Sequence, residues 1–355
     1  MKHWHETKTI LDRVANLTGE RAPAVIATVV RIAGSAYRRP GAKLLVEQTG
    51  ETCGGISGGC LESDVRAQAL EMLEGASGRL LHYDTGSDEE TLWGMGLGCE
   101  GAVDIYLQPA GEQLLKLREH FAQGQPFANV TLIDGPRAGW QAVFARGALD
   151  GSTGNAELDQ KLVQRTAALL EGNGDSQVFE IDGHQAFIDV LRTPPRLMIF
   201  GAGDDARPLG TLASQAGFEV MIVDHRPAYL TADRFPAPAQ LVLRRPEAGV
   251  EGLGLTRNHF AVVQTHALQH DRAWVRALAA KQLAYLGLLG PRGRKEQVMR
   301  DLALDENALF APVGLDLGAD GPEQVAISIV AEMLAVHAHR EPRHLRARQG
   351  GIHAA

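Results

Sequence analysis

The chain contains few cysteines and few aromatic residues for its length. Three cysteines occur among 355 residues, and phenylalanine, tryptophan and tyrosine together make up 5% of them. Three thiols cannot all pair with one another, so the sequence excludes a disulfide framework and indicates a reducing compartment. The length is nevertheless sufficient for two domains with ordinary hydrophobic cores.

The chain also lacks long apolar runs and an excess of positive charge. No segment approaches the roughly 20 apolar residues of a membrane span, and residues 1–6 lack the apolar core of a signal peptide. The formal net charge of −8 argues against an extended surface for nucleic acid. We therefore expect a cytoplasmic protein that binds neither nucleic acid nor membrane.

Glycine, by contrast, is abundant, with 40 residues, and it is concentrated around one cysteine. The segment 53–62 reads CGGISGGCLE, in which Gly58 and Gly59 directly precede Cys60. Apolar residues then repeat at helical spacing; they are Leu61, Val65, Ala69, Met72 and Leu73. This pattern predicts a helix with Cys60 at or beside its N-cap.

Two interpretations of Cys60 follow from this position. A thiol at a helix N-terminus can ionise at neutral pH and act as a nucleophile or metal ligand. A free cysteine is, however, commonly a buried and inert residue in a tight turn. The surrounding glycines allow a ligand to approach the backbone closely, which supports the functional interpretation.

A second glycine-rich loop, at residues 94–101, also carries a cysteine, Cys99, and leads into a predicted strand. A metal held by Cys53, Cys60 and Cys99 is the less favoured explanation, because their spacing matches no zinc pattern. A third loop, 34–42, contains Arg38 and Arg39 between two apolar strands. Paired arginines suit phosphate or carboxylate recognition, although solvated charges on a hairpin tip are the simpler alternative.

The second half of the chain alternates between strands and helices. The strand 197–200 runs into Gly201, Gly203 and Ala206 in a Gly-x-Gly-x-x-Ala loop, and a helical pattern follows it. The next strand ends at Asp224. This complete unit predicts a Rossmann-like fold, in which the helix N-terminus faces a pyrophosphate and the acid faces a ribose.

A further loop of this half follows strand 260–264 and contains His266. Ligands of open α/β sheets bind at the carboxyl ends of the strands, so His266 is expected near Gly201 and Asp224. It is either a general base or ligand contact, or an ordinary polar loop residue. NAD(P) or another nucleotide is the ligand that this region predicts.

We expect the two halves to meet at the Pro194-Pro195 pair, which interrupts both sheet and helix. The predicted fold is α/β, with an N-terminal α+β domain carrying glycine-rich loops at 1–192. A C-terminal Rossmann-like domain with a doubly wound parallel sheet follows at 196–338, and a flexible tail at 339–355.

Taken together, these motifs resemble the XdhC/CoxI family of xanthine dehydrogenase accessory proteins over nearly the whole chain. The segments that carry the resemblance are GSAYRRPGA at 34–42, GISGGCLE at 55–62, GLGCEG at 96–101, GAGDDARPL at 201–209, VDHR at 223–226, QTH at 264–266 and PVGLDLG at 312–318. Glu100 stands where the family pattern has a glycine, and Cys53 matches no family motif.

The resemblance implies a chaperone rather than an enzyme. Such a protein binds the molybdenum cofactor (molybdopterin with its metal), assists its sulfuration by a cysteine desulfurase, and delivers it to apo xanthine dehydrogenase or a related molybdoenzyme. The family's important cysteine falls on Cys60, which would contact the molybdenum, and the second cysteine motif falls on Cys99. We also expect a homo-oligomer.

Two alternatives remain open at this point. The C-terminal half could make the protein an NAD(P)-dependent oxidoreductase, although only His266 and some arginines suggest a catalytic set. A docking protein without a small-molecule ligand is the other alternative.

Overall fold

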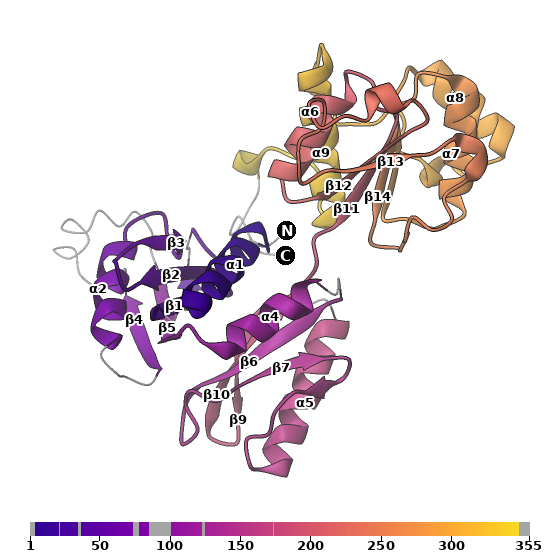
Figure 1. Cartoon of the computed structure of the whole chain (residues 1–355). Helices are drawn as coiled ribbons and strands as arrows, with labels where there is room; N and C mark the ends of the chain where they lie inside the picture. The colour runs from indigo at the N-terminus through magenta and orange to yellow at the C-terminus, as the bar shows by residue number, and fades with distance from the viewer. Residues whose placement is uncertain are drawn as a thin grey trace. The chain divides into compact units, whose positions relative to one another are not determined.

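The computed structural model describes residues 4–20, 22–34, 37–73, 78–84, 101–122, 125–172 and 174–347. It divides into two compact units, one of Lys2–Thr193 and one that contains Pro194–Ala355 together with Met1. Its three five-stranded sheets are here called sheets A, B and C (Figure 1). Sheets A and B belong to the first unit, and sheet C belongs to the second.

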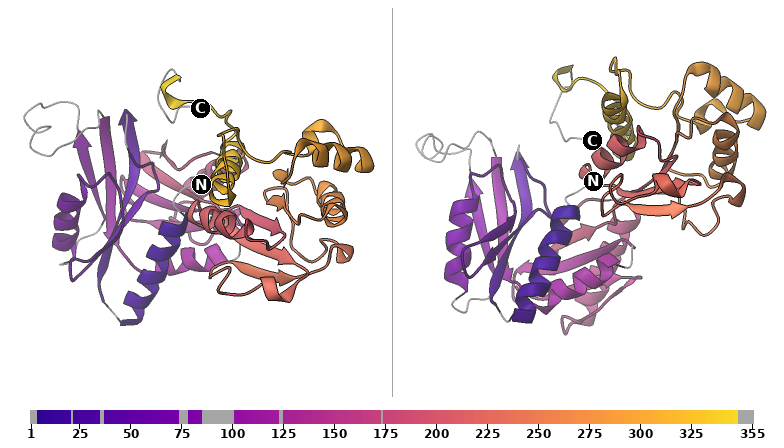
Figure 2. Two further views of the ribbon diagram at one scale, coloured as in Figure 1. Left: turned by 90° about the horizontal axis from the view of Figure 1, so that it is seen from above. Right: turned by 45° about the horizontal axis from the view of Figure 1, so that its top comes forward.

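Sheet A is antiparallel and has the strand order β3-β2-β1-β5-β4. The strands are β1 (Ala24–Gly34), β2 (Lys43–Glu47), β3 (Thr52–Gly54), β4 (Arg79–Asp84) and β5 (Gly101–Pro109). Helix α2 (Glu62–Met72) packs on one face through Val65, Ala69 and Met72, as its apolar spacing predicts. Helix α1 (Trp4–Glu20) lies on the opposite face (Figure 2).

Sheet B is also antiparallel, with the order β8-β7-β6-β10-β9. Its strands are β6 (Phe127–Asp134), β7 (Gln141–Ala145), β8 (Ala148–Leu149), β9 (Gln177–Ile181) and β10 (His184–Leu191). Helix α5 (Ala156–Glu171) covers its outer face, and α4 (Glu112–Ala122) joins α1 in a cluster with residues of sheets A and B. The first unit is therefore layered, with helices outside and between two sheets.

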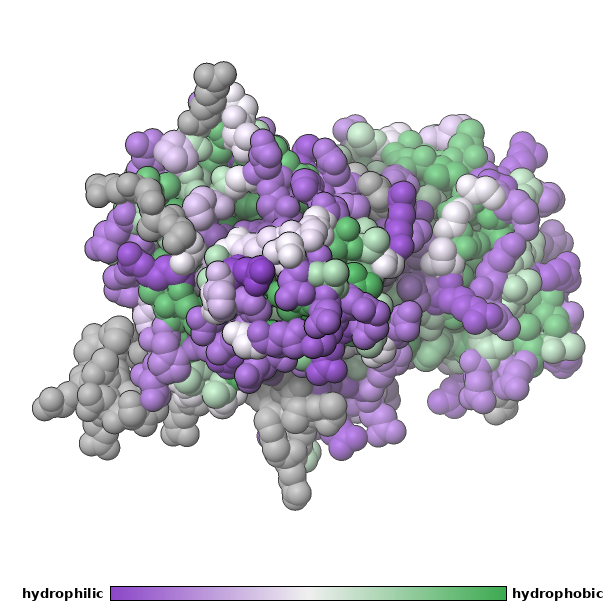
Figure 3. Space-filling view, turned by 90° about the horizontal axis from the view of Figure 1, so that it is seen from below, coloured by the Kyte–Doolittle hydropathy of each residue, from purple (hydrophilic) through white to green (hydrophobic). Residues whose placement is uncertain are grey.

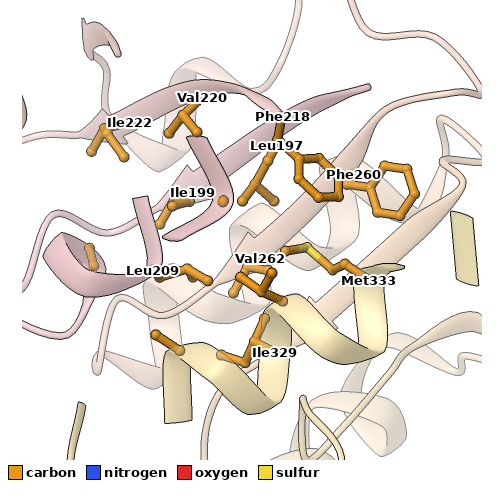
Figure 4. Close-up of a cluster of buried hydrophobic side chains, with 14 of the residues drawn as sticks. Leu197, Ile199, Leu209, Phe218, Val220, Ile222, Phe260, Val262, Ile329 and Met333 are labelled. Carbon is orange, nitrogen blue, oxygen red and sulfur yellow. The ribbon is translucent and has the colours of Figure 1, made fainter. Parts of the chain in front are cut away.

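Sheet C is parallel, with the order β13-β12-β11-β14-β15. The strands are β11 (Arg196–Phe200), β12 (Glu219–Asp224), β13 (Gln240–Leu243), β14 (Phe260–Val263) and β15 (Tyr285–Leu288). Helices α6 (Ala206–Gln215) and α9 (Pro322–His337) pack on one face (Figure 4), and α7 (Leu268–Ala279) and α8 (Arg292–Leu302) on the other. This doubly wound parallel sheet confirms the predicted Rossmann-like fold.

Both faces of sheet C are covered by helices and buried residues. Alternate residues of β11 and β14 enter the two clusters, so each strand is an almost continuous apolar run.

None of the helices that the structure describes is both long and apolar enough to cross a membrane. The face seen in Figure 3 is mainly hydrophilic, with hydrophobic residues in separate patches.

Candidate functional site

Two of the predicted loops, those with Cys60 and with Arg38, lie at the same end of sheet A as the start of β5. Strand β1 ends at Gly34, which pairs with Gly101 at the start of β5, and Ala102 beside it pairs with Asp84 at the end of β4. Strand β3 ends at Gly54, which pairs with Leu44 near the start of β2. The antiparallel register therefore gathers the Cys60 loop, the arginine loop, the end of β4 and the start of β5 at this end of the sheet.

The loop that carries Cys60 is organised by Ser57 and Glu62. One oxygen of Glu62 accepts hydrogen bonds from the backbone N–H groups of Ile56 and Ser57, at 3.1 and 2.8 Å, and the other accepts from the Ser57 hydroxyl. The Ser57 oxygen accepts in turn from the N–H groups of Gly59 and Leu61, at 3.0 and 3.2 Å. A serine and a carboxylate thus fix the shape of the loop.

The carboxylate of Glu62 is held in its ionised form by these contacts. Burial by itself raises the pKa of Glu62, but the hydrogen bonds from Ser57 and Ile56 outweigh it and keep that pKa below its ordinary value. The negative charge also lies in the first turn of α2, where the helix dipole favours it.

Cys60 directly precedes Leu61, the N-cap residue of α2, as predicted. Its side chain is half-buried against the apolar cluster between α2 and sheet A, and its Sγ lies 3.5 Å from the Ser57 oxygen. The thiol is therefore held at the surface of the unit, with one side packed and the other accessible.

The glycines of this loop serve different purposes. Gly54 has φ +91°, and a Cβ atom there would collide with the Lys43 carbonyl. The packing of the sheet therefore requires glycine at this position. Gly59 has φ +112° but open space around it, and a Cβ on Gly58 would lie 4.0 Å from the ring of Tyr37. Exposed backbone beside Cys60 is thus accessible to a ligand.

The arginine loop contributes Tyr37 rather than Arg38 to this surface. Tyr37 is 72% exposed and lies next to Gly58. The guanidinium of Arg38 instead binds Glu6 of α1, and its Nε atom is buried without a hydrogen-bond partner among the described residues. Arg39 is half-buried, and its carbonyl closes the turn by accepting from the N–H of Ala42 at 3.0 Å.

Of the three cysteines, Cys53 and Cys60 lie in the part of the chain that is described. Cys53 packs in the cluster beneath α1, where burial, followed by the charges of Glu6 and Glu47, raises its pKa. Cys99 and Glu100 lie outside the described residues. No group of three or more metal-binding side chains occurs among those that are described.

In the second unit, Gly201 is required by packing. It has φ +113°, and a Cβ atom would lie 2.5 Å from the carbonyl oxygen of Gln264 at the end of β14. A Cβ on Gly203 would lie 2.6 Å from Asp205, and Ala206 is fully buried at the start of α6. These small residues therefore let segments of the chain itself pack closely together.

Asp224 stands where the Rossmann pattern places it, but its oxygens have internal partners. They accept from the N–H of Ala202 at 2.7 Å and from the backbone and guanidinium of Arg226 at 2.8 to 3.0 Å. Burial alone would raise the pKa of Asp224, yet the hydrogen bonds from Arg226 and Ala202 lower it to about 2. A ribose would have to replace one of these bonds.

His266 occupies a left-handed conformation, with φ +59°, after β14. Its ring is largely exposed, and its Nε2 lies 2.8 Å from the carboxylate of Asp205 at the N-cap of α6. The structure thus brings Gly201, His266 and Asp224 to the carboxyl ends of adjacent strands. Nucleotide binding at this place stays a prediction.

Sequence reasoning missed Ser57, Tyr37 and the role of Glu62 in the loop. The sequence places Glu62 only near the start of the helix predicted after Cys60. Its hydrogen bonds to residues five and six positions earlier depend on how the loop folds back, and no periodic pattern reveals this.

Chemically, the loop end of sheet A can present a soft sulfur ligand beside exposed backbone and an aromatic ring. A thiolate suits molybdenum or another sulfur-binding metal. An exposed ring such as Tyr37 suits a planar heterocycle.

Comparison with known proteins gives one family match in each half of the chain. The family described as "XdhC and CoxI family" matches residues 17–84, and the "XdhC Rossmann domain" matches residues 197–333. A crystal structure of a xanthine dehydrogenase from Bacillus halodurans is similar, with a TM-score of 0.79 and 28% identity, and covers 93% of this chain and 96% of that chain.

Two curated proteins are similar over almost their full length. "Molybdenum cofactor insertion chaperone PaoD" of Escherichia coli (strain K12) is 26% identical over 96% of this chain and 94% of its own. A probable xanthine dehydrogenase subunit of Bacillus subtilis (strain 168) is 33% identical over 92% of this chain and 96% of its own. The two family matches, together with a relative of this identity and coverage, show that the chain belongs to the XdhC and CoxI family.

Proposed function

We propose that this protein is an accessory factor in the maturation of a molybdenum enzyme. In this role it binds the molybdenum cofactor at the Cys60 loop, assists its sulfuration and delivers it to xanthine dehydrogenase or a related molybdenum hydroxylase. The names of its relatives, an insertion chaperone for this cofactor and a xanthine dehydrogenase subunit, support this role.

The residues at the loop end of sheet A fit such a ligand. Cys60 offers a sulfur ligand that is packed on one side only, and the open space at Gly59 admits a bulky group. When bound, the cofactor supplies a molybdenum atom held by a dithiolene on a pterin that ends in a phosphate. Cys60 would contact the metal, Tyr37 would lie against the pterin, and Arg39 and Cys99 are proposed as further contacts.

We also propose a cellular location, an oligomeric state and two partner proteins. The protein acts without catalysing a reaction of its own, in the cytoplasm, as a homo-oligomer. An apo molybdoenzyme receives the cofactor, and a cysteine desulfurase supplies sulfur to it. Ser57 and Glu62 hold the loop in one shape, which keeps the thiol in place before the cofactor arrives.

The single observation that carries the proposal is the half-exposed Cys60 held by Ser57 beside open backbone. We expect Cys60→Ala to reduce retention of the cofactor at least about tenfold, or about 1.4 kcal/mol. The measurement is pterin fluorescence after oxidation of protein that has been loaded with the cofactor and passed through gel filtration. Cys53→Ala is the matched control, because it removes a thiol packed beneath α1 and should retain the cofactor normally.

Equal retention by the two variants would remove Cys60 from the site. Circular dichroism of both variants establishes that the fold is intact, which separates loss of a contact from loss of structure.

A further inference from the structure

Helix α9 is apolar on more than the side it buries. Its inner face, which includes Ile329 and Met333, packs against α6 and sheet C (Figure 4). Its outer face carries Ile327 and Leu334, which are 52% and 37% exposed. Together with Ala331 between them, these residues form one stripe along the helix.

Two more exposed leucines lie in the segments that precede and follow the helix in the chain. Leu317, 55% exposed, precedes α9 in a segment that hydrogen-bonds to it through Leu315 and Ser328. Leu345, 63% exposed, follows the helix. Four of the eight large exposed hydrophobic side chains among the described residues are therefore on α9 or in the segments that directly precede and follow it in the chain. Such a concentration marks an interaction surface.

Charges of opposite sign flank this stripe. Asp316 and Asp320 are exposed in the segment before α9, and Glu323 is exposed in its first turn. Arg343 and Arg346 are exposed in the segment that follows its C-terminal end, and Arg343 forms only a 3.3 Å surface contact with Glu341. The surface is thus acidic at one end, apolar in the middle and basic at the other.

We propose that this surface binds a second copy of the same chain, with the two α9 helices antiparallel about a two-fold axis near Ala331. Each Ile327 then meets Leu334 of the other copy, and the small Ala331 permits close approach. Each acidic end meets a basic end, so the surface is self-complementary, as a two-fold interface requires. A parallel pair would place like charges together.

This inference rests on the homo-oligomeric state proposed above and is independent of cofactor binding. The charge pattern favours a second copy of this chain as the binding partner, because each copy supplies both an acidic end and a basic end. A partner of a different kind would need only one sign of charge around the apolar stripe.

The test measures the mass of the full chain by sedimentation. The wild type is expected to be a dimer, and Ile327→Glu combined with Leu334→Glu should make it monomeric. The matched control is Leu243→Glu, which changes an exposed leucine on β13 and should remain dimeric. Circular dichroism verifies that each variant is folded.

A charge exchange sharpens the test. One variant carries Asp316→Lys and Asp320→Lys, and another carries Arg343→Glu and Arg346→Glu. Each alone should dimerise at least about tenfold more weakly, because its two ends now have the same sign. Mixing the two variants should restore dimers, because every end then meets its opposite.

The outcomes distinguish the two proposals. A monomeric wild type overturns both the homo-oligomer and this interface. A wild-type dimer that is unaffected by the glutamate and charge variants overturns only the assignment to α9. Loss of dimers in both charge variants without recovery on mixing overturns the antiparallel arrangement.

Discussion

At the scale of single residues, carboxylates hold both glycine-rich loops in shape. Glu62 accepts two backbone N–H groups of the Cys60 loop, and Asp224 accepts the N–H of Ala202 behind Gly201. In each case an ionised side chain satisfies amides that a glycine-rich turn would otherwise leave without partners. Asp224, which was expected to bind a ribose, therefore also stabilises the fold.

The first residue-scale prediction concerns Asp224. Its pKa of about 2 in the folded protein lies below its ordinary value of 3.8, so its ionised form stabilises the fold above pH 4. Asp224→Asn should lower the free energy of unfolding of the second unit by about 2 kcal/mol at pH 7. The difference should shrink as the pH falls from 4 towards 2, because the wild-type carboxylate then becomes protonated.

Hydrogen exchange of peptides from β11 and β12, measured in full-length protein across this pH range, reports the effect. Glu219→Gln is the matched control, because it changes an exposed carboxylate of the same strand that forms a 3.3 Å pair with Arg196. Exposed pairs contribute little, so this variant should exchange like the wild type. A constant difference between Asp224→Asn and the wild type at every pH would contradict the proposed role of the charge.

At the scale of elements, a buried ion pair joins sheets A and B. Lys43 of β2 lies 2.5 Å from Asp189 of β10, and both side chains are almost fully buried. Lys43 also donates to the carbonyl of Gly41 at 2.9 Å, and Asp189 accepts from Ser176 at 3.1 Å. The pair adjoins a cavity of about 10 Å³ between the sheets, close to the volume that one water molecule needs.

The prediction at this scale is that breaking the pair destabilises the first unit. Lys43→Met leaves the charge of Asp189 buried without its partner, which costs about 3 to 5 kcal/mol. Adding Asp189→Asn to Lys43→Met should recover part of the loss, because no uncompensated charge then remains. Urea unfolding followed by far-ultraviolet circular dichroism measures both variants.

The matched control is Lys161→Met, which removes an exposed lysine that is paired with Asp182 in the same unit. We expect no measurable change for this variant. If Lys43→Met and Lys161→Met behaved alike, the buried pair would not join the sheets as described.

The elements themselves were predictable to different degrees. The Rossmann-like half could be recognised because each strand, glycine loop and helix follows the one before it, so local patterns contain the topology. In the first unit, the pairing of the strands could not be predicted in this way. Antiparallel partners such as β1 and β5 are some 70 residues apart, and alternation alone does not specify which strands pair.

The candidate site shows the same limit. The position of Cys60 beside a helix N-cap followed from helical spacing, whereas the contact of Tyr37 with Gly58 depends on the return of the arginine loop along β1. The choice of Glu6 as the partner of Arg38 depends on where α1 packs. Both contacts depend on the tertiary structure, and they cannot be predicted from a single sequence.

At the scale of the whole molecule, each hydrophobic cluster lies within one unit. Two clusters surround sheet C, and four occupy the layers around sheets A and B. A unit with its own core can unfold as its own cooperative block. Damage to the core of one unit should therefore leave the other folded.

The whole-molecule prediction uses Ile329, which is 1% exposed and packs from α9 against α6 and sheet C. Ile329→Ala removes buried methyl groups and should destabilise the second unit by about 2 to 5 kcal/mol. Hydrogen exchange should then become faster in peptides from 197–333 and stay unchanged in β1, β5, β6 and β10. The reciprocal variant Ile188→Ala, in the core beneath α5, should show the opposite pattern. If either substitution accelerated exchange throughout the chain, the two units would form one cooperative block, and the effects of Cys60 and Asp224 variants could no longer be assigned to separate sites.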